Sequence, residues 1–156
     1  FDNSDEMVAQ CIKNLKDNGV TRKFEIKNSD LNMGVALPNA SVVVMCLTLQ
    51  FIRPLYRERL LQDIYNQMNE NGCLILVEKV HGEDSLFNRM FIKYYYDFKR
   101  RNNYNDMEIA QKREALENVL IPYKLHENRE MILNKGFRYC ETFFKWYNFA
   151  GIVAIK

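Results

Sequence analysis

The stretch Ser41-Val-Val-Val-Met-Cys-Leu47 is a continuous apolar run of the kind that a strand buried on both faces of a sheet requires. Pro54 then stands at the first turn of an expected helix that ends at Asn71-Gly72. A second buried strand is expected over residues 73–80. Strand, helix and strand in this order predict a right-handed βαβ crossover, and with it a doubly wound α/β fold.

Upstream of this unit, the sequence predicts a helix, a short strand and a loop. Ser4 is a suitable N-cap for a helix that ends near Asn18-Gly19. Residues 23–27 alternate as a short strand, and residues 28–38 form a loop. The chain begins at Phe1, without a Met, at what resembles a strand-to-helix junction. We therefore expect an N-terminally truncated chain that lacks the first strands of its sheet.

Downstream, a long and mostly helical excursion over residues 83–135 separates the strands expected at 73–80 and 137–146. An insertion of this length is typical of a substrate lid or a dimer surface. The last strand, at residues 149–155, is expected to form an antiparallel hairpin with its predecessor at the sheet edge. No repeat or linker interrupts the chain, so residues 1–156 are expected to form a single domain.

The composition excludes several classes of protein. With 22 Lys and Arg against 20 Asp and Glu, the formal net charge is +2, and no direct nucleic-acid partner is expected. No apolar run approaches the roughly 20 residues of a membrane span, so no membrane partner is expected. Cys11, Cys46 and Cys73 lie in apolar runs and are interpreted as small buried residues in a reducing cytoplasm. The cysteines and two histidines lack metal-ligand spacing, so no metal is expected.

In an open parallel sheet, ligands bind outside the carboxyl ends of the strands. Asp2 is expected at such an end, where it either accepts from ribose hydroxyls or compensates the dipole of the first helix. Asp30, followed by Leu31, either flanks an adenine ring or forms a turn. The six glycines are too widely separated for a loop that cradles phosphate or methionine. The principal loop of a nucleotide site would therefore precede Phe1.

Arg113 belongs to the charged stretch from Asp97 to Arg113, whose second half has helical periodicity. Arg113 falls four residues after Ile109 and three before Leu116, which predicts that it faces inward. It either presents its guanidinium to a ligand carboxylate, pairs with Glu117 or Asp97, or extends along the apolar surface to place its charge in solvent. No nucleophile and base are arranged for covalent catalysis, so any catalysis would rest on positioning and electrostatics.

Several segments resemble, in order and near-spacing, the carboxy-S-adenosyl-L-methionine synthase family. This resemblance spans essentially the whole chain and rests most specifically on Asp-Phe-Lys-Arg followed by Gln-Lys-Arg. The family has the Rossmann-like fold of S-adenosylmethionine-dependent methyltransferases. The matching segments are Asp2-Asn3-Ser4, Asn39-Ala40-Ser41, Leu47-Thr48-Leu49-Gln50-Phe51, Glu78-Lys79, Asp97-Phe98-Lys99-Arg100, Gln111-Lys112-Arg113, Leu116-Glu117-Asn118-Val119 and Asn148-Phe149.

The resemblance implies an enzyme that joins S-adenosylmethionine to a carboxyl group from prephenate and releases phenylpyruvate. The product, carboxy-S-adenosylmethionine, would feed an enzyme that modifies the wobble uridine of tRNAs, and a homodimer is implied. By the same resemblance, Asp2 and Asn3 would hold the ribose, Asp30 and Leu31 the adenine, and Arg113 the added carboxylate.

Two departures from the family pattern bear on the expected site. Cys46 stands where the family has a ligand-binding Asn, and a thiol cannot replace the paired donor and acceptor of an amide. The Gly-rich loop and the N-terminal Tyr of the family are absent, so we expect weak cofactor binding and an inactive chain. An ordinary small-molecule methyltransferase and a non-catalytic interaction module are the alternative functions.

Overall fold

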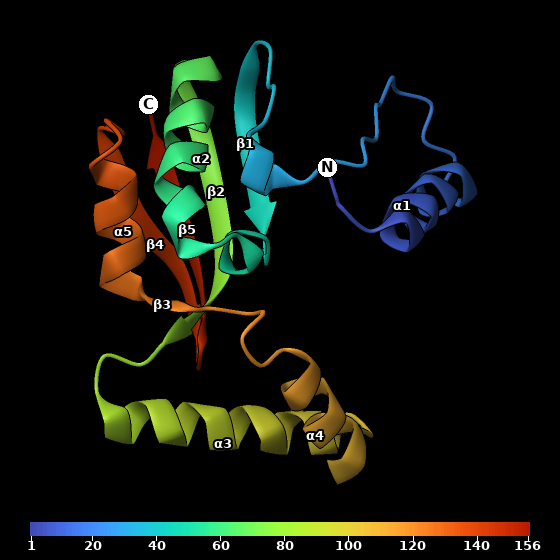
Figure 1. Cartoon of the computed structure of the whole chain (residues 1–156), viewed down its shortest axis with the longest axis vertical. Helices are drawn as coiled ribbons and strands as arrows, with labels where there is room; N and C mark the ends of the chain where they lie inside the picture. Colours follow the sequence, from blue (N-terminus) through green and yellow to red (C-terminus); the bar gives the residue numbers. More distant parts are fainter.

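The computed structural model describes all residues 1–156, and its centre is a five-stranded mixed sheet (Figure 1). Four strands lie in the order β1 (Ala40–Cys46), β2 (Met68–His81), β5 (Phe149–Ile155) and β4 (Tyr139–Trp146). β1 and β2 are parallel, whereas β5 is antiparallel to both β2 and β4. The two-residue β3 (Tyr123–Lys124) pairs with the end of β2. The parallel pair and the C-terminal hairpin confirm the sequence predictions.

Two helices, α2 (Pro54–Gln67) and α5 (Leu125–Leu133), pack on one face of this sheet. Their apolar side chains meet those of β1, β2, β4 and β5 in a single core, in which Leu61, Leu74 and Ile132 are completely buried. Burying such a side chain stabilises a protein by roughly 1.5–3 kcal/mol. The βαβ unit formed by β1, α2 and β2 therefore shares one core with α5 and the C-terminal hairpin.

The prediction that the strand at 41–47 is buried on both faces is wrong, because the opposite face of β1 is not covered. Successive side chains of a strand point to opposite faces, so Met45 is buried against the helices while Val42 and Val44 are 58% and 60% exposed. The doubly wound arrangement has helices on both faces, and in residues 1–156 only one face of β1 is covered by a packed helix.

Helix α1 (Asp5–Asp17) confirms the first predicted helix, including its N-cap, because the Ser4 hydroxyl accepts from the backbone N–H of Met7 at 3.3 Å. Its predicted apolar side is not buried, and Figure 1 shows the helix standing apart from the sheet. The strand predicted at residues 23–27 is wrong, since that segment has no paired neighbour and makes only one bridge nearby, between Asp2 and Asn28.

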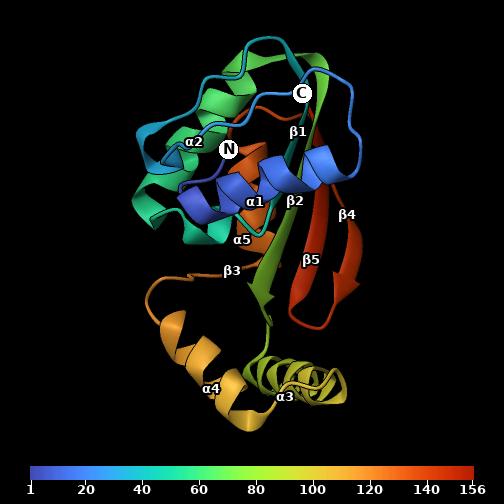
Figure 2. The same ribbon diagram turned by 90° about the vertical axis from the view of Figure 1, so that its right-hand side faces the viewer.

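The helical excursion divides into two parts with different surroundings. Helices α3 (Ser85–Arg101) and α4 (Asp106–Ala115) lie beyond the end of β2, clear of the sheet faces (Figure 2). Helix α5 instead buries Met131 and Ile132 in the core. Of the helical segment predicted over residues 83–135, only α3 and α4 stand clear of the sheet, and α5 belongs to the main layer.

Other details of the prediction are corrected by the structure. Helix α2 ends at Gln67, before the predicted Asn71-Gly72, because buried Met68 already continues into β2. All four cysteines are free thiols, but Cys11 and Cys46 are exposed rather than buried. No helix has the combination of length and apolar character that crossing a membrane needs.

Candidate functional site

The loop that leaves the carboxyl end of β1 is tightly held. β1 ends at Cys46, and Leu47 adopts a left-handed backbone conformation with φ of 55°. The Leu47 N–H donates to the carbonyl of Val77 on β2 at 2.7 Å. The chain then enters the short 3-10 helix η2 (Leu49–Phe51). This is the position at which open parallel sheets bind ligands.

The Glu78 side chain, on β2, holds this loop in place. Its carboxylate accepts three backbone N–H bonds, from Thr48 at 3.1 Å, from Leu49 at 2.9 Å and from Gln50 at 3.0 Å. Glu78 is 3% exposed, and burial raises its pKa to about 7 although the three N–H bonds and Arg57 favour the charged form. The loop geometry therefore depends on a carboxyl group that titrates near neutral pH.

Arg57 connects the same loop to the chain that returns from α4. Its guanidinium donates to the carbonyls of Ile52 at 2.9 Å, Gln50 at 3.1 Å and Ile121 at 2.6 Å. It also lies 4.3 Å from the ring centroid of Tyr123. The side chain is 1% exposed, and burial lowers its pKa. One buried cation thus joins η2, α2 and β3.

Sequence reasoning did not assign these two residues to the site. A signal was present for each: Glu78 is a charge that follows a buried apolar run, and Arg57 lies on the same face of α2 as Leu61 and Ile64, at i+4 and i+7. A charged residue in an apolar stripe indicates a buried, partnered group.

Asp2 is held by one local side-chain bond and by two backbone bonds to a distant loop. The Asp2 carboxylate accepts from the Ser4 N–H at 2.9 Å, as expected of a residue that precedes a helix. The Asp2 backbone donates to Lys27 and accepts from Ser29, which brings it beside the loop that contains Asp30. Asn3, which follows Asp2, is exposed.

Asp30 forms a turn. Its carboxylate accepts from the backbone N–H of Asn32 at 2.9 Å and from the Asn32 side-chain amide at 2.7 Å, and these bonds lower its pKa. Asp30 is thereby the N-cap of the 3-10 helix η1 (Leu31–Met33). One Asp30 oxygen accepts both bonds, so its second oxygen has no protein partner.

An apolar cavity of about 90 Å³ lies between the N-terminal segment and the end of β1. Leu31 lines it directly, and Phe1 and Met45 bring the neighbours of Asp2 and Cys46 to its wall. Of the predicted site residues only Leu31 lines this space, and Asp2 and Cys46 are chain neighbours of residues that do. Its lining residues include Phe1, Leu31, Val35, Val44, Met45 and Thr48.

Arg113 is not part of this group. It lies in the last turn of α4, its side chain is exposed, and neither Glu117 nor Asp97 pairs with it. The prediction that it faces inward is wrong, because Ile109 alone of α4 is buried.

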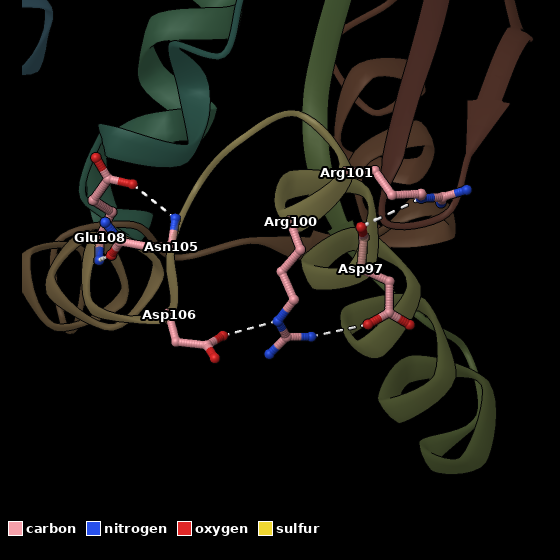
Figure 3. Close-up of polar contacts among 6 residues, drawn as sticks. All are labelled: Asp97, Arg100, Arg101, Asn105, Asp106 and Glu108. Atoms are coloured by element: carbon pink, nitrogen blue, oxygen red, sulfur yellow. Dashed lines mark hydrogen bonds and ion pairs between the residues drawn. The ribbon is translucent and has the colours of Figure 1, made fainter.

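Asp97 has a different partner. Arg100 donates to Asp97 at 2.9 Å and to Asp106 at 2.8 Å, and so joins the end of α3 to the start of α4 (Figure 3). A capping box between Asn105 and Glu108 starts α4. Arg100 is exposed, so this bridge contributes little stability but sets the direction of α4.

Comparison with known proteins gives the relationship of the chain. It is 61% identical over 155 residues, 99% of its length, to the carboxy-S-adenosyl-L-methionine synthase of Methylococcus capsulatus. It is 43% identical over all 156 residues to the enzyme of the same name from Nautilia profundicola. The chain is a homologue of the carboxy-S-adenosyl-L-methionine synthases. It spans 64% and 65% of the length of these two relatives.

Solved structures agree on the fold of this synthase homologue. The chain superimposes with a TM-score of 0.67 on an O-methyltransferase family 2 protein from Planctomyces limnophilus, covering 97% of this chain and 40% of that one at 17% identity. The S-adenosylmethionine-dependent methyltransferase SibL gives a TM-score of 0.63 at 12% identity, covering 97% of this chain and 41% of SibL. The fold is thus the α/β Rossmann-like methyltransferase fold. A scan against protein-family models found no match.

Proposed function

We propose that this chain is part of an enzyme that converts S-adenosylmethionine and prephenate into carboxy-S-adenosylmethionine and phenylpyruvate. The observation that carries the proposal is the 61% identity to a synthase of that name over 99% of the chain. Prephenate as the carboxyl donor follows from the resemblance of the sequence motifs. The methyltransferase fold supports S-adenosylmethionine as the second substrate.

The reaction balances without a further reactant. Prephenate loses its ring carboxyl as carbon dioxide and its ring hydroxyl as hydroxide, and the ring becomes aromatic. The sulfonium acidifies the adjacent methyl group of S-adenosylmethionine, which loses a proton and forms a carbon–carbon bond to carbon dioxide. The proton and the hydroxide combine to water. The protein would then act by positioning the two substrates and excluding bulk water.

The described residues suit this division of labour. Asp2 and Asn3 are assigned to the ribose, and Asp30 and Leu31 to the adenine, beside the apolar cavity that Leu31 lines. Exposed Cys46, at the end of β1, takes the place of the family Asn toward the methionine end. An apolar cavity with polar groups on neighbouring residues is what a nucleoside with one flat apolar part and one hydroxylated part requires.

Arg113 is assigned to the carboxylate of the product. Its guanidinium is exposed and makes no ion pair, so it has no competing carboxylate to displace. A planar fork matches a carboxylate in a bidentate way. Because an exposed ion pair contributes little, tight binding would require the ligand or a second subunit to shield the Arg113 guanidinium from water.

Mass spectrometry tests the reaction directly. Purified protein is incubated with S-adenosylmethionine, with and without prephenate, and the products are weighed. The expected product is S-adenosylmethionine heavier by one carbon dioxide, formed only with prephenate. Loss of the methyl group instead would identify an ordinary methyltransferase and overturn the proposal. Calorimetry with S-adenosylmethionine distinguishes a chain that does not bind it and acts only as an interaction module.

A cytoplasmic homodimer that supplies a tRNA-modifying enzyme completes the proposal. Helix α3 supports the dimer, because several of its large apolar side chains are exposed, and such patches mark interaction sites. They are Leu86, Phe87, Met90, Tyr94 and Phe98. Sedimentation equilibrium checks the dimer: a monomer at all concentrations would contradict it.

A further inference from the structure

A cluster of aromatic rings lies where α3 crosses the ends of β2 and the C-terminal hairpin. Tyr95 of α3 packs edge-on against Phe149 with ring centroids 5.2 Å apart, and Phe98 packs against Trp146 at 4.9 Å. Trp146 also contacts Tyr147 at 4.7 Å. The cluster stands beyond the carboxyl end of β2, where an open α/β sheet binds ligands.

Two ammonium groups share one ring of this cluster. The Nζ of Lys79 is 5.5 Å from the Tyr95 ring centroid, and the Nζ of Lys99 is 4.9 Å from it. Lys79 comes from β2 and Lys99 from α3. Neither ammonium forms an ion pair or a hydrogen bond with any residue of the chain.

This arrangement is electrostatically unfavourable by itself. Burial lowers the pKa of Lys79 and the charge of Lys99 lowers it further, while burial and Lys112 lower the pKa of Lys99. A cation over an aromatic ring gains only a modest stabilisation, and two partly desolvated like charges repel. If the two lysines had only a structural role, a nearby carboxylate would neutralise them, as Glu58 pairs with Lys135 at 2.7 Å. An anion between Lys79 and Lys99 would supply what is missing.

The pair is also connected to the loop at the end of β1. The backbone N–H of Lys79 donates to the Gln50 side chain at 3.0 Å, and Glu78, the residue before it, holds η2. The backbone of Lys79 is therefore fixed relative to the loop that follows Cys46. A second substrate there would lie next to a nucleoside bound at the end of β1.

We propose that Lys79, Lys99 and Tyr95 form the binding site for a carboxylate of the second substrate, a cyclic dicarboxylate. The two ammonium groups would receive the carboxylate, and the rings of Tyr95 and Trp146 would pack on the unsaturated six-membered ring. This inference rests on the proposed function, since it places the carboxyl donor of that reaction.

Trp146, the only tryptophan of the chain, is a built-in reporter because its ring lies 6.3 Å from that of Tyr95. Its fluorescence is followed while prephenate is added to wild type, Lys79→Met, Lys99→Met and Lys99→Arg. Methionine keeps an unbranched apolar chain and removes the charge. The matched control is Lys93→Met, an exposed lysine of the same helix.

Each methionine variant of the pair is expected to weaken prephenate binding about tenfold or more, the value of a charge-assisted hydrogen bond. Lys99→Arg should restore most of the affinity, and Lys93→Met should match wild type. The affinity for S-adenosylmethionine, measured by calorimetry, should stay within about twofold of wild type, which a general loss of structure would not allow.

Equal prephenate affinity in wild type, Lys79→Met and Lys99→Met overturns the proposal, as does an equal loss in Lys93→Met. Lys79 is the more buried of the two, so if its variant unfolds, Lys99→Met alone decides. The proposed function fails separately: lysine-dependent prephenate binding without a carboxylated product would retain this site and reject the reaction. A carboxylated product, with the same Michaelis constant for prephenate in wild type and in the lysine variants, would retain the reaction and reject this site.

Discussion

The end of β1 and the N-terminal segment both carry predicted site residues, but they are held in different ways. At the end of β1, Glu78 and Arg57 are 3% and 1% exposed and each makes three hydrogen bonds to backbone groups. In the N-terminal segment, the carboxylates of Asp2 and Asp30 accept only from residues two positions away, and α1 buries none of its side chains. The end of β1 is thus positioned by buried core residues, whereas the side chains of Asp2 and Asp30 are positioned by local turns.

Removing the cation of the first region should have the largest effect. Arg57→Met leaves the carbonyls of Ile52, Gln50 and Ile121 without their donor in a buried place, and Glu78 without its nearest cation. Breaking such a network costs about 3–5 kcal/mol. Urea unfolding measures the loss. Arg59→Met, on the exposed side of α2, is the control and should cost under about 1 kcal/mol.

Glu78 makes this region sensitive to pH. Its folded-state pKa, about 7, lies above its ordinary value of 4.5, so the folded protein binds the proton more tightly than the unfolded chain. The protonated Glu78 carboxyl therefore contributes its full stabilisation below pH 4.5. This stabilisation is lost as the pH rises through 7. Across this pH range, the free energy of unfolding is expected to decrease by about 3 kcal/mol.

The control for this titration is Glu78→Gln, which removes the titrating group and keeps one acceptor oxygen. The variant should lack this decrease in the free energy of unfolding, measured by urea denaturation at a series of pH values. Parallel pH profiles for the two proteins would contradict the assignment of the titration to Glu78.

Truncating one apolar side chain in the core and one in the N-terminal segment tests the difference in packing between them. Leu61 is completely buried, and Leu61→Ala should cost about 3 kcal/mol through lost contacts and a cavity. Ile12 lies on the apolar side of α1, which packs against nothing, so Ile12→Ala should cost under about 0.5 kcal/mol. Thermal unfolding compares them. An equal loss for both would mean that α1 is packed in solution.

The same contrast explains what could be predicted from the sequence. The runs at Ser41–Leu47 and 73–80 predicted the parallel pair because a continuous apolar run is typical of a central strand, although β1 is covered on one face only. Helix α1 was predicted with its cap, but periodicity shows only that an apolar side exists, not what covers it. The failed strand at 23–27 has the same reason, since strand pairing depends on a distant segment.

Site residues divide in the same manner. The turn of Asp30 was among the alternatives because it is local, and the bonds to Asn32 show it. The Glu78 contacts join residues about 30 positions apart, and those from Arg57 to Ile121 join residues 64 apart. No local pattern specifies such a pairing, so only the presence of a charge in an apolar stripe could have indicated it.

Arg113 should show the smallest effect on stability and a specific effect on binding. Its side chain is exposed and unpaired, so Arg113→Ala should change the free energy of unfolding by under about 0.5 kcal/mol. If it receives the product carboxylate, the variant should lose preference for carboxy-S-adenosylmethionine over S-adenosylmethionine, because only the former offers a second carboxylate. Calorimetry with both compounds measures the preference, and Lys112→Ala on the same turn of α4 is the control. A variant that is clearly destabilised yet still discriminates would assign Arg113 to structure, and the carboxylate would then need another cation.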